Sequence, residues 1–183
     1  MVKFQEGLKY PWGKPGRLWN ILWFLVPIIG WFALHGYIVR IVQDLNKGRV
    51  KELPKMDKFW DKFVLGFMIF IKMIPFCILL GIISWILQLI PVAGMVAYGF
   101  ISLFIVPYLM INLMVTEKFS SLFEFSKVVK VVFGNFRKYV IALIMTLFYV
   151  AVYVLLSFVL VGIPCLSFGG NYFLVEFYRT AKH

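Results

Sequence analysis

The chain has 183 residues and a net charge of +11, and it is 62% hydrophobic and 15% charged, with a mean hydropathy of +0.90. A soluble globular domain holds only about 45–50% apolar residues, so this composition excludes an ordinary water-soluble fold. So short and so apolar a chain also leaves little room for a separate catalytic domain. We therefore expect one all-α domain, residues 1–183, embedded in a bilayer.

Apolar residues form three long runs, at 18–39, 63–115 and 139–177. A membrane-spanning helix needs about 20 residues, so the second and third runs each predict two helices joined by a turn. Pro91 and Pro164 mark these turns, because proline ends one helix and suits the first turn of the next. The prediction is a polytopic integral membrane helix bundle with five to six membrane segments. These segments are 18–39, 63–89, 92–115, 139–161 and 164–179.

The first run carries a similar aliphatic-proline phrase at Pro27. Similar phrases at Pro27, Pro91 and Pro164 predict three helical hairpins. The arm at 18–26 is only about 14 Å of helix, too short for a hydrocarbon core of about 30 Å. Two alternatives remain open for 18–39, namely a re-entrant hairpin and a single proline-kinked span, and they place the N-terminus on different sides of the membrane.

Basic residues avoid the predicted spans: eighteen of the nineteen Lys and Arg lie before residue 18, in 40–62, in 116–138 or in the C-terminal tail. Cytoplasmic flanks of membrane helices carry such an excess. We expect a multi-pass membrane protein, with loops 40–62 and 116–138 and the C-terminus in the cytoplasm. Anionic lipid headgroups are the expected counter-charge, and nucleic acid is not an expected partner because no nucleic-acid-binding motif accompanies the charge.

An amphipathic stretch at 120–136 predicts one interfacial helix. Ser121 and Glu124 have the spacing of a capping box at its start. Its basic side chains would contact lipid headgroups; they are Lys127, Lys130, Arg137 and Lys138. The alternative is that this helix packs across the cytoplasmic face of the bundle.

Two ionisable residues interrupt the predicted spans, and such residues are costly unless they are paired or face water. Lys72 lies about 14 Å from the charged side and Glu176 about 18 Å from the opposite side, so the two reach nearly the same depth. We hypothesise an intramembrane ion pair between them. The alternative is local: Lys72 extends to the interface, and Glu176 pairs with Arg179 at spacing i,i+3.

Several short motifs occur in a fixed order along the chain. They are Gly36-Tyr37-x-x-Arg40, Gly48, Leu53-Pro54, Asp57, Trp60-Asp61, Phe63-x-x-Gly66, Lys138-Tyr139, Gly170-Asn171-Tyr172 and Tyr178-Arg179. This order resembles the prokaryotic membrane family called domain of unknown function 4013. The resemblance implies a multi-helix membrane domain with no established activity, and it supplies no catalytic residues.

No nucleotide-binding, zinc-protease or nucleophile-elbow motif occurs, so we expect no enzyme, no cofactor and no metal site. The first interpretation is a structural or accessory subunit of a membrane assembly, whose partners are lipids and other membrane subunits or further copies of itself. The alternative is a transporter or channel component that uses Lys72 and Glu176 at membrane depth.

Overall fold

The computed structural model describes residues 4–158 and 160–181, and within these ranges the chain is all-helical, as its composition predicts. Short 3-10 and π-helical stretches, labelled η, connect or extend the α-helices. The elements are α1 (Phe4–Lys9), η1 (Tyr10–Gly13), η2 (Pro15–Leu25), α2 (Ile29–Asn46), α3 (Phe59–Leu87), α4 (Pro91–Phe100), η3 (Ile101–Ile105), α5 (Val106–Thr116), η4 (Phe119–Phe123), α6 (Phe125–Gly134), α7 (Phe136–Ser157), α8 (Gly162–Gly169) and α9 (Tyr172–Ala181).

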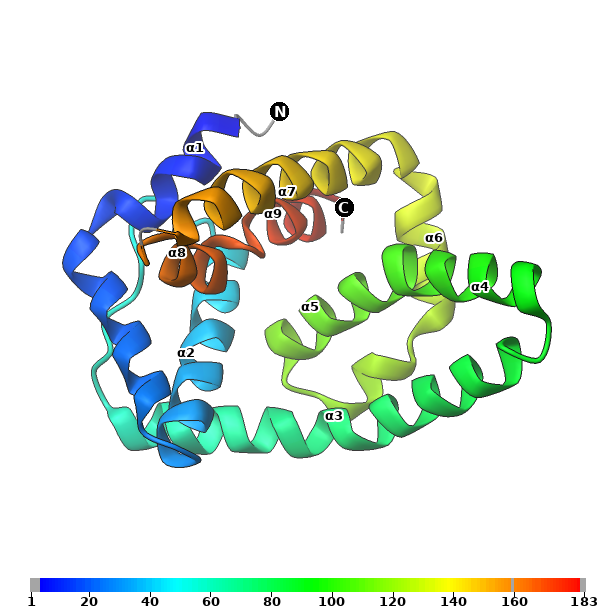
Figure 1. Ribbon diagram of the computed structural model, residues 1–183, viewed down its shortest axis with the longest axis horizontal. Coiled ribbons are helices and arrows are strands. Elements are labelled where there is room, and N and C mark those ends of the chain that lie inside the picture. The colour runs from blue at the N-terminus through cyan, green and yellow to red at the C-terminus, as the bar shows by residue number, and fades with distance from the viewer. Residues whose placement is uncertain (1–3, 159, 182–183) are drawn as a thin grey trace.

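Helix α2 is the hub of the arrangement and packs against η2, α3, α5, α8 and α9. In Figure 1, α3 runs along one edge of the molecule and α7 along the opposite edge, with α2 standing between them. Helices α4 and α5 return along α3, and α6 leads from there to the start of α7. The chain ends with α8 and α9, which lie beside α7.

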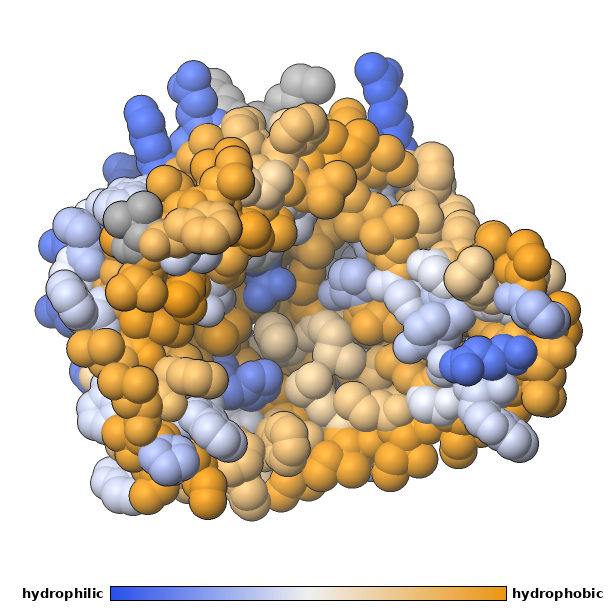
Figure 2. Space-filling view, in the orientation of Figure 1, coloured by the Kyte–Doolittle hydropathy of each residue, from blue (hydrophilic) through white to orange (hydrophobic). Residues whose placement is uncertain are grey.

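Within residues 4–158 and 160–181, three helical stretches are long and apolar enough to cross a membrane: Phe59–Leu87, Pro91–Thr116 and Phe136–Ser157. Only 17–22% of the most apolar window in each is buried inside the protein. Figure 2 shows the result: hydrophobic side chains cover most of the visible face, while hydrophilic ones lie along its upper and left edges, in a central hollow and in a patch at the right. Such an apolar surface is what a membrane protein presents to lipid.

The tightest helix contact is the crossing of α2 and α3, and two glycines permit it. A Cβ on Gly36 would lie 1.9 Å from the Lys62 carbonyl oxygen, and a Cβ on Gly66 would lie 1.9 Å from the Phe32 carbonyl oxygen. The two backbones therefore approach closer than any larger residue allows. Small residues at such crossings are a common device of membrane helices, where dispersion contacts drive association.

The interior is rich in tyrosine: eight of the nine tyrosines are buried. Several of their hydroxyls donate to backbone carbonyls of other elements. Tyr139 reaches Leu103 at 2.9 Å and Tyr149 reaches Cys165 at 2.6 Å. Each such bond satisfies a buried polar group and ties two elements together. The core is therefore specified by hydrogen bonds as well as by apolar packing.

The stretch predicted as segment 18–39 folds as a hairpin. The 3-10 helix η2 ends at Leu25, and α2 begins at Ile29 and packs back against it. Trp31 Nε1 donates to the Phe24 carbonyl oxygen at 2.9 Å, which links the two arms. Of the two alternatives for this run, the hairpin is the one that forms, because Pro27 interrupts the helix.

The predicted segment 164–179 is not one continuous helix. It consists of α8 and α9, with 8 and 10 residues, separated at Gly170-Asn171. A helix of this length extends only about 12–15 Å, so neither can cross the bilayer alone. Seven of the ten residues of α9 are buried, which makes it a core element. Apolar composition alone did not distinguish burial in protein from burial in lipid.

The predicted helix 120–136 also differs in detail. A 3-10 turn, η4, precedes α6, and Glu124 rather than Ser121 is the residue before the helix. The capping box does not form, because Ser121 Oγ donates to the Lys118 carbonyl oxygen at 2.6 Å while Glu124 accepts a bond from Asn112. Ser121 thus bonds within η4's own turn and Glu124 bonds to α5, so neither makes the reciprocal bond that the spacing predicts.

The three proline turns do not gather at one side of the molecule, as three parallel hairpins would require. The α3–α4 turn lies at the opposite end of the long axis from the α7–α8 turn (Figure 1). Phe24 and Leu25, which precede the Pro27 turn, do however line a common apolar pocket with Ile163 and Pro164. The weak repeat in the sequence therefore marks helix breaks and does not define a threefold repeated architecture.

Candidate functional site

The loop at 47–58, which joins α2 to α3, is fixed by donors from three different elements. Arg17 of η2 donates to the Leu53 carbonyl oxygen, Tyr37 of α2 donates to that of Pro54 at 2.8 Å, and Lys62 of α3 donates to that of Asp57. Leu53 itself is fully buried. A long connection is thus held in one conformation by its backbone carbonyls.

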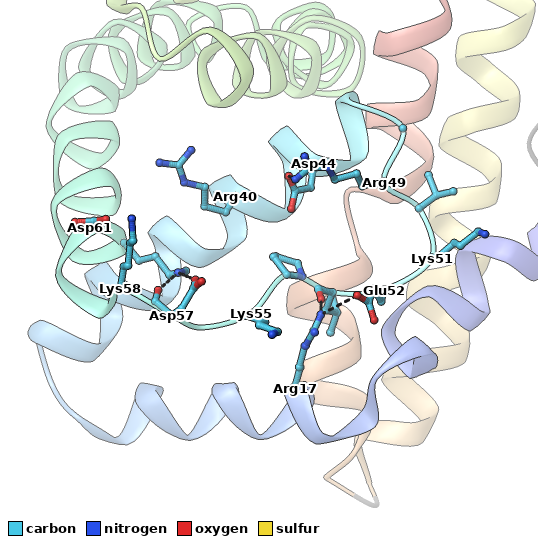
Figure 3. A pocket seen from close by; sticks show the side chains of 15 residues that line it. Arg17, Arg40, Asp44, Arg49, Lys51, Glu52, Lys55, Asp57, Lys58 and Asp61 are labelled. Carbon is cyan, nitrogen blue, oxygen red and sulfur yellow. Dashed lines mark hydrogen bonds and ion pairs between the residues drawn. The ribbon is translucent and has the colours of Figure 1, made fainter.

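A hollow of about 740 Å³ lies between this loop and the helices that hold it. Figure 3 shows charged side chains from η2, α2, the loop and α3 around it. Its charged lining residues are Arg17, Arg40, Asp44, Arg49, Lys51, Glu52, Lys55, Asp57, Lys58, Asp61 and Lys62. Seven of these are basic and four acidic, so the lining carries a net positive charge.

Three of the four carboxylates are neutralised by neighbours. Glu52 lies 3.7 Å from Arg17, Asp44 lies 3.1 Å from Arg49, and Asp57 lies 3.0 Å from Lys62. The Lys62 side chain is only 7% exposed, and a buried ammonium requires such a partner. These pairs neutralise three of the four carboxylates. The remaining positive charge of the lining therefore belongs to basic side chains that do not hold the loop.

The clasp between Lys62 and Asp57 also affects the titration of the carboxyl. Its hydrogen bond from Lys62, followed by the charge of the same ammonium, lowers the pKa of Asp57 below its ordinary value. Both effects favour the charged carboxylate. The clasp is therefore intact at neutral pH and weakens only in acid.

A second polar cluster lies in the core, around Asn112 of α5. Its amide nitrogen donates to the Ser121 carbonyl oxygen at 3.0 Å and to Glu124 Oε2 at 3.1 Å, and its amide oxygen accepts from the Tyr178 hydroxyl at 2.7 Å. Lys127 Nζ lies 2.7 Å from Glu124 Oε2. This cluster joins α5, η4, α6 and α9, and we call it the Asn112 junction.

The structure does not pair Lys72 with Glu176. Lys72 Nζ donates to the Glu117 carbonyl oxygen at 2.7 Å, at the C-terminal end of α5. Glu176 instead accepts two bonds of 2.6 Å from Arg179, one helical turn away. The local alternative for Glu176 is the one that forms. The depth comparison fails because α9 is a short, buried helix and not a membrane span.

The four basic residues predicted to contact lipid headgroups have different surroundings. Lys127 is engaged in the Asn112 junction, whereas Lys130 is exposed on α6. Arg137 and Lys138, at the start of α7, line a hollow of about 520 Å³ together with Glu176 and Arg179. The structure thus brings three of the predicted site residues, Arg137, Lys138 and Glu176, to one place between α7 and α9.

Two features escaped prediction from the residues one by one. The first is the set of hydrogen bonds that hold loop 47–58, which depends on tertiary contacts. The residues involved were nevertheless visible in the sequence, since Gly36, Tyr37, Leu53-Pro54, Asp57 and Gly66 all belong to the family resemblance. The tyrosine core gave a weaker signal, because aromatic residues are equally typical of membrane interfaces. Within the described residues, no group of three or more His, Cys, Asp and Glu side chains is placed to hold a metal ion.

The fold and the exposed apolar helices define a helical protein of the membrane class, with a basic hollow at one helix connection. A family model described as "Protein of unknown function (DUF4013)" matches residues 20–162, so the chain belongs to that family. This confirms the resemblance inferred from the short motifs. Comparisons with curated proteins and with solved structures give no match.

Proposed function

We propose that this chain is a structural or accessory subunit of a membrane assembly. In this proposal α3, α4 to α5 and α7 cross a prokaryotic cell membrane, and the broken pair α8–α9 returns across it together. The hairpin 18–39 completes the five to six membrane segments, and loops 40–62 and 116–138 and the C-terminus face the cytoplasm. The observation that carries the proposal is the exposure of its most apolar helices. Only 17–22% of the most apolar window in each of the three long helical stretches is buried inside the protein.

Large exposed residues continue along both long edges of the molecule. Phe67 on α3, Phe100 at the end of α4 and Phe148 on α7 are 40%, 44% and 61% exposed. Lipid can cover such side chains, but contiguous apolar surface of this extent also suits packing against helices of another subunit. Other membrane subunits, or further copies of this chain, are therefore the proposed protein partners.

Lipid is the second proposed partner. Lys130, Arg137 and Lys138 are exposed and basic, and anionic headgroups attract such residues at the cytoplasmic surface. The transporter or channel alternative rested on a pair between Lys72 and Glu176. Each of these residues has another hydrogen-bond partner, so this alternative loses its main support.

Site-specific photo-cross-linking in the native membrane tests the proposal. Benzoylphenylalanine would replace Phe67, Phe100 or Phe148, and Phe173, which is 1% exposed, provides the buried control. We expect one defined protein adduct at an exposed position and none at Phe173. Mass spectrometry of the adduct identifies the partner, and an adduct with the chain itself makes the assembly a homo-oligomer. Lipid-only adducts at all exposed positions, together with a monomeric native mass, would overturn the subunit proposal.

A further inference from the structure

We propose that the hollow beside loop 47–58 binds the phosphate headgroup of an anionic phospholipid, with Arg40 and Lys58 as its principal contacts. The site requires only that the chain lies in a membrane. It does not require the protein partner of the proposed function. The argument rests on how the cations around the hollow divide into two groups.

The first group holds the protein together. Arg17 is engaged with the Leu53 carbonyl oxygen and with Glu52, Arg49 with Asp44, and Lys62 with Asp57. Because these cations fix the loop and neutralise its acids, the walls of the hollow exist before any ligand arrives. A preorganised wall lowers the ordering cost of binding.

The second group makes no ion pair within the described residues, although the charge of Lys58 also acts on the Asp57 carboxylate that Lys62 holds. Among the described residues, four cations of the lining have no ion-pair partner: Arg40, Lys51, Lys55 and Lys58. Arg40 donates to the neutral amide oxygen of Gln43 at 2.8 Å, which holds its guanidinium without cancelling its charge. Guanidinium and ammonium groups are the side chains that bind phosphate oxygens.

Arg40 and Lys58 extend toward the same side of the hollow, where α3 begins, whereas Lys51 lies at the far end of the loop (Figure 3). Lys58 has a left-handed backbone, with φ of +48°. This conformation is uncommon for a residue with a side chain and persists only where the surroundings impose it. Here it turns the loop into α3 and sets the direction of the lysine.

The neighbouring residues favour a lipid over a soluble phosphate. Phe59 and Trp60 follow Lys58 directly, and Trp60 is 65% exposed. Phe59 packs on Trp23 with ring centroids 4.4 Å apart, and Trp60 packs on Phe63 at 5.6 Å. A basic hollow beside an exposed aromatic cluster matches the headgroup level of a bilayer, where Trp is enriched.

Asp61 is the one lining carboxylate with no ion-pair partner among the described residues. It would repel a phosphate at the same end of the hollow. This gives the proposal a prediction of opposite sign: removal of the Asp61 charge should strengthen binding. A merely basic surface that attracts lipid from all sides would not depend on these individual positions.

Native mass spectrometry of the full chain in detergent measures binding of phosphatidylglycerol, with phosphatidylcholine as the zwitterionic lipid. We expect preferential binding of phosphatidylglycerol, weakened about fivefold by either Arg40→Gln or Lys58→Gln, as expected for the loss of one cation near a headgroup. Asp61→Asn should strengthen binding by a similar factor. Lys47→Gln removes an equal charge from an exposed residue outside the lining and should leave binding unchanged.

Two outcomes would overturn the site. If Arg40→Gln and Lys58→Gln bind phosphatidylglycerol as Lys47→Gln does, the hollow is not where the lipid binds. If glycerol phosphate, which has no acyl chains, binds as tightly as the lipid and displaces it, the ligand is a soluble phosphate. Because all four substituted residues are exposed, each variant should fold, and the cross-linking result on subunit partners has no bearing on either outcome.

Discussion

Helices α7 and α9 pack against each other, but they have opposite relations to the rest of the protein. Only four of the 22 residues of α7 are buried, and they are Tyr139, Ala142, Tyr149 and Tyr153. Seven of the ten residues of α9 are buried. The more apolar helix is therefore the more exposed one. In this protein the more apolar helix is the one left to contact lipid, while the buried positions of both helices include tyrosines.

Helix α3 likewise packs on α2 with one face while most of it stays exposed. A substitution on the packed face should have the largest effect on stability. Gly66→Leu would place side-chain atoms where the Phe32 carbonyl oxygen of α2 lies, at the crossing that fixes the hub helix. Backbone cannot yield as a flexible side chain does, so we expect loss of the folded state in detergent, measured as aggregation in size-exclusion chromatography. Gly81→Leu is the matched control, because a Cβ at Gly81 meets nothing within 4 Å.

If Gly66→Leu remained monodisperse with an unchanged melting temperature, α2 and α3 would not cross at these glycines. The assignment of α2 as the hub would then be wrong. If Gly81→Leu failed equally, the surface of α3 around Gly81 would be a protein interface and not a lipid-facing surface.

The Asn112 junction anchors buried α9, and its disruption should have the next largest effect. Asn112→Leu removes the acceptor of the Tyr178 hydroxyl and the donor to Glu124. Loss of such buried partners costs about 1–3 kcal/mol. Combining it with Tyr178→Phe, which removes the hydroxyl, should cost less than the sum of the two single changes. A double-mutant cycle of unfolding in mixed micelles measures this coupling, and strict additivity would show that the two residues do not interact.

A smaller effect should follow from the tyrosines that face inward from α7. Tyr149→Phe removes the bond to the Cys165 carbonyl oxygen and should destabilise the protein by about 1 kcal/mol, the net value of one such bond. Tyr98→Phe on α4 is the control, since the structure gives the Tyr98 hydroxyl no hydrogen bond among the described residues. Leu147→Ala, at a position 68% exposed, should change stability by less than about 0.5 kcal/mol in detergent. Equal effects of Tyr149→Phe and Leu147→Ala would remove the distinction between the two faces of α7.

Much of the fold could be predicted from length, hydropathy and proline. These features place the helices near 63–89, 92–115 and 139–161, where the structure has α3, α4 to α5, and α7. They could not identify α9 as buried, because a run of apolar residues is compatible with either environment. Nor could they reveal the partner of Lys72, since Glu117 contributes a backbone carbonyl, and every residue carries one.

The candidate site was predictable in part. The motif residues Tyr37, Pro54 and Asp57 are spread along the chain, and only the fold shows that they take part in hydrogen bonds that hold the same loop. The basic character of 40–62 was visible in the sequence. Which cations are neutralised and which remain available depends on distances of a few ångströms, and these are set by the α2–α3 crossing rather than by spacing in the loop.

The smallest expected effect concerns the clasp between Lys62 and Asp57 and is a pH dependence. Lys62 lowers the pKa of Asp57 in the folded protein, so the folded state binds this proton less readily than the unfolded state does. The clasp therefore contributes its full stability above the ordinary carboxyl pKa of about 3.9, and that contribution is lost as the pH falls through the lower folded value.

Limited proteolysis of loop 47–58 by pepsin, followed from pH 5 to pH 2, should show cleavage rising across this window. Asp57→Asn should raise cleavage already at pH 5 and flatten the profile, because the amide has no proton to gain. Asp61→Asn is the matched control, and it should keep the profile of the unmodified chain, since the structure gives Asp61 no ion pair among the described residues. Parallel profiles for the unmodified chain and Asp57→Asn would show that Lys62 holds the loop through the Asp57 carbonyl alone, without the carboxylate.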